Sequence, residues 1–216
     1  MFRKITDIYE DYKIMPNLQK HMLRVAAVAS VICDNFSEKI DKDNVVIACL
    51  FHDMGNIIKS DLNYFPNFLQ PEGLEYWQKV KEKYIEKYGS SEHTATETIM
   101  KEIGLPERAI FYFKNMGFHN STKNETEKFL EHKICNYSDM RVGPYGVIPM
   151  EERIEEGHKR YLGREHSLAS DDFEFLVKSL RNIEKQIFAK CKIKPEDVNN
   201  ESVAPIILEL RNFVVQ

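Results

Sequence analysis

Four residues whose side chains commonly bind metal ions stand at wide intervals along the chain. His21 falls on the apolar face of a helical pattern, His52 and Asp53 are neighbours in the stretch ACLFHDMG, and Asp139 lies near the end of another helical pattern. Histidine and aspartate are costly to bury unless something satisfies them, and a bound metal ion is one such thing. Imidazole nitrogen with carboxylate oxygen suits Mn, Fe, Mg, Co or Zn. These residue types, in this order, therefore indicate a metal site.

Helices must carry these residues, and the sequence predicts helices along almost all of its length. Apolar residues recur at three-and-four spacing after Pro16, with Asn17 as the expected N-cap, and a second pattern over 44–55 ends at Gly55. Residues 56–73 read as a long irregular connection. Further helical patterns cover 73–89, 90–104, 106–117, 125–143, 150–163, 171–193 and 201–215. Adjacent helix residues point about 100° apart, so His52 and Asp53 can share one ion only where their helix faces the interior.

Composition restricts the class of protein. The chain has 216 residues, 43% hydrophobic and 30% charged, with a net charge of −4. These values are typical of a water-soluble globular protein, and they do not favour nucleic-acid binding, which usually needs a basic domain. No run of apolar residues is long enough for a membrane span and the first residues do not resemble a signal peptide, so we expect a cytoplasmic protein. Cys33, Cys49, Cys135 and Cys191 are far apart, and we expect them to be reduced.

The order His, His-Asp, Asp on three helices resembles the HD superfamily of metal-dependent phosphohydrolases. The resemblance includes the apolar ACLF before the pair, the MG after it and the HxxxV segment that begins at His21, and it runs from about Leu18 to Arg141. It implies an all-α fold: a single multi-helix bundle whose metal-binding core covers residues 1–145, with C-terminal helices in 146–216 packing on the same domain. It also implies metal-assisted hydrolysis of a phosphoester or phosphoanhydride in a nucleotide or another small phosphorylated molecule.

Some branches of this superfamily bind two metal ions, and two further histidines match them in order. His93 lies in SSEHTATETI and His119 in MGFHNS, both between the His-Asp pair and Asp139. The resemblance then implies that His21, His52 and Asp139 hold the first ion and that His93 and His119 complete the second. Asp53 bridges the ions or faces the attacking water. Iron or manganese is the expected metal, with magnesium, cobalt, nickel or zinc as alternatives.

The phosphate-binding residues depart from the family pattern. Many members carry a lysine directly after the HD-x-G step, where this chain has Asn56. Our hypothesis is that Lys59 replaces it and that Arg141 also orients the phosphate, because guanidinium groups match phosphate oxygens. Arg153 and Arg160 are expected to pair with nearby glutamates instead. Three histidines in charged stretches are expected to be solvated: His132, His158 and His166.

An aromatic group follows the His-Asp pair: Tyr64, Phe65, Phe68, Tyr76 and Trp77. These rings stack a nucleobase beside the metals or pack a loop onto a helix, and packing is the more common role. We expect the residues that select the substrate to lie in 56–73, 141–150 and the C-terminal helices.

Two other functions share this pattern. A subset of HD proteins with the same six ligands holds a mixed-valence di-iron pair and uses dioxygen to cleave carbon–carbon or carbon–phosphorus bonds. The other alternative is a regulatory module that binds a nucleotide or a structural metal without catalysis. The complete set of ligand positions argues against the regulatory module, since a degenerate domain would be expected to have lost a ligand.

Overall fold

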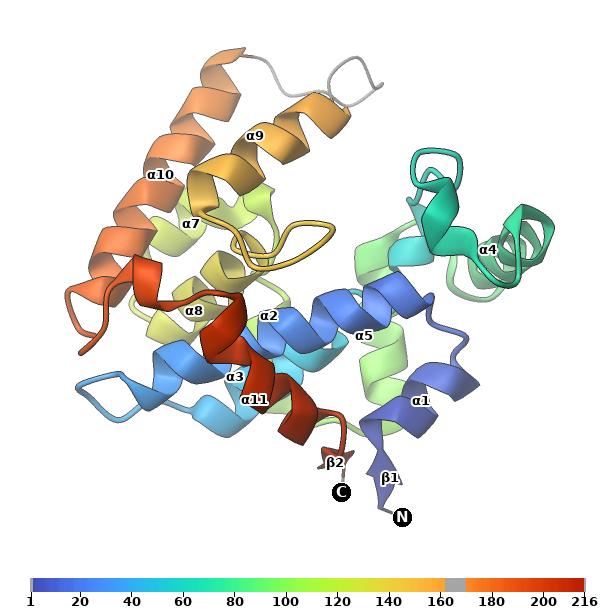
Figure 1. Ribbon diagram of the computed structural model, residues 1–216, viewed down its shortest axis with the longest axis horizontal. Coiled ribbons are helices and arrows are strands. Elements are labelled where there is room, and N and C mark those ends of the chain that lie inside the picture. The colour runs from blue at the N-terminus through green and yellow to red at the C-terminus, as the bar shows by residue number, and fades with distance from the viewer. Residues whose placement is uncertain (1, 162–169, 216) are drawn as a thin grey trace.

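The computed structural model describes residues 2–161 and 170–215 (Figure 1). Its regular structure in these residues is almost entirely helical, which confirms the all-α prediction. The α-helices are α1 Ile5–Asp11, α2 Pro16–Asp34, α3 Lys42–Phe51, α4 Leu74–Tyr88, α5 Glu92–Ile103, α6 Glu107–Phe113, α7 Ser121–Thr126, α8 Leu130–Asp139, α9 Met150–Tyr161, α10 Ser170–Phe188 and α11 Asn200–Leu210. Among the described residues, none of the helices combines the length and apolar character that a membrane span requires.

Short elements connect and close the bundle. In the described residues, 3₁₀ helices lie between the α-helices: η1 Asn56–Ile58, η2 Pro66–Leu69, η3 Phe118–Asn120 and η4 Pro195–Asp197. Strands β1 Arg3–Lys4 and β2 Val214–Val215 pair antiparallel, with Arg3 opposite Val215, so the two ends of the chain lie side by side (Figure 1).

Helix α2 lies at the centre of the fold. Its residues from Val25 to Cys33 are all buried, and it packs against α3, α8 and α11. The helix begins at Pro16 with Met15 as its N-cap, so the expectation that Asn17 caps it is wrong. The reason is that proline lacks an N–H and has a helical φ, which favours the first helical position and leaves Asn17 inside the first turn.

Helix α3 ends earlier than the sequence pattern predicts. Its last residue is Phe51 and His52 is its C-cap, so Gly55 does not stop the helix. Gly55 instead lies where the chain passes close to α5: a Cβ atom built on it would be 2.4 Å from the carbonyl oxygen of Glu92 and 2.8 Å from Cβ of Ala95. Only a residue without a side chain fits between the His-Asp pair and that helix.

The segment 56–73 is more ordered than expected, because it contains η1 and η2. Leu62 and Leu69 are buried in the core, and Trp77 of α4 donates a hydrogen bond from Nε1 to the carbonyl oxygen of Leu69 at 3.2 Å. These residues anchor the segment to the body of the protein.

The burial of His132 also differs from the prediction. It was expected to be solvated, but its exposed fraction is 1%. Its Nδ1 lies 2.5 Å from Oε2 of Glu127, and the rings of Phe111 and Phe129 contact it. The adjacent charged residue Lys133 is also buried, at 6% exposure, so charged neighbours in the sequence do not indicate exposure here. The four cysteines are free thiols, as predicted.

Candidate metal centre

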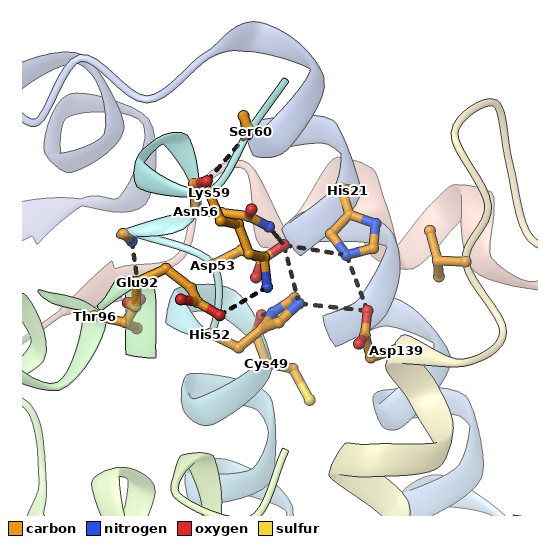
Figure 2. Close-up of polar contacts among 12 residues, drawn as sticks. His21, Cys49, His52, Asp53, Asn56, Lys59, Ser60, Glu92, Thr96 and Asp139 are labelled. Carbon is orange, nitrogen blue, oxygen red and sulfur yellow. Dashed lines mark hydrogen bonds and ion pairs between the residues drawn. The ribbon is translucent and has the colours of Figure 1, made fainter. Parts of the chain in front are cut away.

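Three helices bring the four predicted ligands of the first ion together. His21 comes from α2, His52 and Asp53 from the end of α3, and Asp139 from the last turn of α8 (Figure 2). His21 Nε2 lies 3.0 Å from Oδ1 of Asp139 and 3.6 Å from Oδ2 of Asp53. His52 Nε2 lies 3.6 Å and 3.7 Å from the same two oxygens. Each of the two imidazole nitrogens therefore lies within 3.7 Å of a carboxylate oxygen of Asp53 and of Asp139.

The hydrogen bonds of His52 fit a metal ligand. Its Nδ1 lies 2.8 Å from the carbonyl oxygen of Cys49, which can only accept, so in the neutral imidazole, the form that binds a metal, Nδ1 carries the proton and Nε2 keeps its lone pair. This Nε2 atom is buried and has no hydrogen-bond partner among the described residues. A buried acceptor of this kind, beside two carboxylates, suits a cation.

The charges of the site also favour a cation. Burial raises the pKa of Asp53, but the charges of His52, His21 and Lys59 outweigh it and hold the pKa below its usual value. Asp139 has its pKa held well below the usual value, because the hydrogen bond with His21 and the neighbouring imidazole of His52 overcome the effect of burial. Burial lowers the pKa of His52, yet Asp53 and Asp139 raise it to about 9. Both carboxylates are therefore ionised near neutral pH, and their excess negative charge attracts positive groups.

Residues after the pair fix its orientation. The Asn56 amide, which occupies the place of the frequent family lysine, donates to Oδ2 of Asp53 at 2.5 Å. The backbone N–H of Gly55 donates to Oγ1 of Thr96 at 2.9 Å, and this hydroxyl donates to the carbonyl oxygen of Glu92. Lys59 forms an ion pair with Glu92, with 3.1 Å between Nζ and Oε1 (Figure 2). Glu92 and Thr96 were not predicted from the sequence to belong to the site, although both lie in the first turns of α5 with His93.

A cavity of about 660 Å³ lies over this cluster. All six predicted ligands line it, together with Lys59. The compact group of His21, His52 and Asp53 has ligand atoms within 4.8 Å of one another, and in the described residues Asp139, His93 and His119 lie outside that group. His93 stacks on Phe113, with 4.4 Å between ring centroids, and His119 Nε2 lies 3.1 Å from the amide nitrogen of Asn120. Burial lowers the pKa of both histidines, so both favour the neutral form that binds metals.

The arginines considered as phosphate ligands differ in their surroundings: some make structural contacts and others line the cavity. Arg141 is 4% exposed, and its guanidinium donates to the carbonyl oxygens of Ile148, Pro195 and Val198 and to the Tyr137 hydroxyl. These bonds give Arg141 a structural role in place of the expected phosphate contact.

Arg153 and Arg160 both pair with Glu156, as predicted, at 2.9 Å and 3.1 Å, and both line the cavity. His158 is exposed, and its ring contacts Phe173 at the cavity wall; His166 lies outside the described residues.

Comparison with known families agrees with this geometry. The family model named HD domain matches residues 18–110, which contain His21, the His-Asp pair and His93. Residues 18–110 are thus similar to an HD domain. Most members of this family are metal-dependent hydrolases, and the cluster of histidines and carboxylates suits a divalent metal ion. No curated protein and no solved structure gives a significant match to the chain. His119 and Asp139 follow the matched part, and the fold brings Asp139 back to it.

Proposed function

We propose that this protein is a metal-dependent phosphohydrolase that cleaves a phosphoester or phosphoanhydride bond in a nucleotide or another small phosphorylated molecule. The observation that carries the proposal is the convergence of His21, His52, Asp53 and Asp139 at the wall of one cavity in a chain with a segment similar to an HD domain. The cavity volume lies within the usual range for small-molecule sites, about 300–1,000 Å³.

Metal binding in this proposal follows the arrangement of the side chains. His21, His52, Asp53 and Asp139 would hold one divalent ion, and His93 with His119 would hold a second, most favourably iron or manganese. A bound ion of this kind lowers the pKa of a coordinated water from 15.7 to about 7 and neutralises charge on phosphoryl oxygens.

The protein's own groups orient the reaction. Asp53 is held by the Asn56 amide, so one carboxylate oxygen keeps a fixed direction and can accept a proton from the attacking water. Lys59 lines the cavity, and its ammonium group is positioned by Glu92 to neutralise a phosphate oxygen. The cavity confines the substrate so that its phosphorus stays beside these groups.

Metal content and turnover should change together in Asp53→Asn. We expect this variant to lose most of its bound metal and at least about 100-fold in phosphate release, because it loses a charged ligand and the group that faces the water. Asp34→Asn is the matched control, since Asp34 pairs with Lys42 outside the cavity. Metal content is measured by mass spectrometry and phosphate release with a panel of phosphate esters and anhydrides under anaerobic conditions with Mn²⁺.

The same measurement separates the alternatives. Anaerobic release of phosphate excludes a requirement for dioxygen, whereas activity that appears only with iron and oxygen contradicts hydrolysis. Full activity in Asp53→Asn also contradicts the scheme. His93→Ala should lower the metal content from two ions to one, and an unchanged content of one ion would remove the second site from the proposal.

A further inference from the structure

Four aromatic rings form a continuous cluster beside the cavity: Tyr64, Phe65, Phe68 and Tyr145, here called the aromatic cluster. Ring centroids are 4.7 Å apart for Tyr64 and Phe65, 4.9 Å for Phe65 and Phe68, and 5.7 Å for Phe68 and Tyr145. The first three rings line the cavity, and Tyr145 belongs to the loop before α9, which reaches toward the segment that precedes α4 (Figure 1). The cluster therefore joins two segments that are far apart in sequence.

Buried residues outside the aromatic cluster anchor segment 56–73. That segment is anchored by Leu62, Leu69 and the Trp77 hydrogen bond, all buried. Phe65 and Phe68 are partly buried but do not pack against the hydrophobic core of the described residues. Tyr145 is 73% exposed and Tyr64 is 45% exposed. Large rings gathered at a cavity wall without core contacts are typical of a binding surface.

Two kinds of lining define what the cavity would hold. His21, His52, Asp53, Asp139 and Lys59 suit a phosphate group with its metal ion, and the aromatic cluster offers ring faces that suit a flat apolar group. Phe118 and Phe173, whose centroids are 5.6 Å apart, extend the apolar lining on another side.

We propose that the aromatic cluster is a substrate-selecting subsite, which makes the protein prefer phosphorylated molecules that carry a planar aromatic ring system. The inference rests on the proposed function for the part of the ligand that carries the phosphate. The contact between the ring system and the aromatic cluster can be tested by binding alone. A nucleobase and a simple aryl group share this chemistry, and the experiment separates them.

Two matched pairs of compounds test the subsite. Adenosine 5′-monophosphate and ribose 5-phosphate differ by the base, and 1-naphthyl phosphate and decahydro-1-naphthyl phosphate differ by aromaticity. Dissociation constants are measured by calorimetry on the full chain with Mn²⁺, at a temperature where turnover is negligible, and KM values are measured separately. We expect the ring-bearing member of a pair to bind about 10-fold to 100-fold more tightly, which is the effect of one aromatic stack.

Variants assign the preference to the cluster. Phe68→Leu keeps an apolar side chain and removes the ring, so it should abolish most of the difference within each pair while the affinity for ribose 5-phosphate stays unchanged. Tyr76→Leu is the control, because Tyr76 is an exposed aromatic residue that contacts Trp77 and does not line the cavity. Far-ultraviolet circular dichroism confirms that both variants are folded.

The outcomes are distinguishable. A preference in both pairs that Phe68→Leu removes supports a general subsite for planar rings, and a preference confined to the first pair supports a nucleobase. Equal binding within both pairs, or a preference that survives Phe68→Leu, overturns the inference. Adenosine and 1-naphthol bind without a phosphate, so their binding tests the cluster even if no phosphate ester is hydrolysed and the proposed function fails.

Discussion

Gly55 shows at the residue scale how the His-Asp pair is positioned. Its φ of −95° is open to any residue, so the requirement for glycine is steric. The backbone of Glu92 occupies the place where a side chain would begin, and backbone cannot move as a flexible side chain can. The turn after Asp53 is therefore in close contact with α5, the helix that carries His93. This contact connects the two proposed metal sites.

Gly55→Ala should therefore separate the turn from α5. We expect a loss of about 1–3 kcal/mol in the free energy of unfolding, which is typical of overpacking, together with weaker metal binding. The comparison is Gly157→Ala in the middle of α9, where the added Cβ would only come within 3.1 Å of the Arg153 side chain. That variant should gain up to about 1 kcal/mol through helix propensity. Urea unfolding measures both, and an unaltered midpoint in Gly55→Ala would contradict the steric explanation.

At the element scale, Arg141 connects three parts of the chain. It lies directly after α8 and bonds to the carbonyl oxygens of Ile148, Pro195 and Val198, so it joins the loop before α9 to the segment before α11. The C-terminal helices consequently depend on a side chain from the region of the metal cluster.

Arg141→Met tests this role. The change leaves buried carbonyl oxygens without donors, and we expect it to lower the free energy of unfolding by at least about 2 kcal/mol, since each buried group left unpaired costs about 1–3 kcal/mol. Thermal unfolding checks the expectation, with Arg181→Met as a control because Arg181 pairs with Glu151 at the surface. A stable Arg141→Met variant with a raised KM would instead restore the phosphate-binding role expected from the sequence.

These elements also show what sequence patterns can and cannot predict. The residues of the cluster were predictable, because helix periodicity is a local feature of the chain and the order of His21, His52, Asp53 and Asp139 resembles a known family. The surroundings of Arg141 were not, because its partners Pro195 and Val198 are brought to it only by tertiary packing.

His132 was misplaced for the same reason. Its neighbours in the sequence are charged, whereas its buried contacts come from Phe111 on α6 and from the segment before α8.

At the scale of the whole molecule, the hydrophobic core and the cluster of candidate metal-binding residues occupy different parts of the fold. The hydrophobic core draws residues from Ile5 near the start of the chain to Val215 near its end, whereas the metal cluster lies at its edge beside the cavity. In the described residues, Asp139 already has an ion-pair partner in His21. A core of this extent should keep the helices folded when no metal is bound, unlike a small zinc domain, in which metal binding supplies the folding free energy.

Chelation should therefore lower the melting temperature without abolishing the helical circular dichroism signal. A metal that binds only the native state contributes about 2.7 kcal/mol at 100 times its Kd, which corresponds to about 5–10 °C for a domain of this size. In Asp139→Asn the rise in melting temperature caused by the metal should be lost, because an uncharged amide replaces the second carboxylate. Asp34→Asn on the surface should retain this rise. Loss of the helical signal in chelator would mean that the metal is structural, and an identical melting temperature with and without metal would contradict binding to the native state.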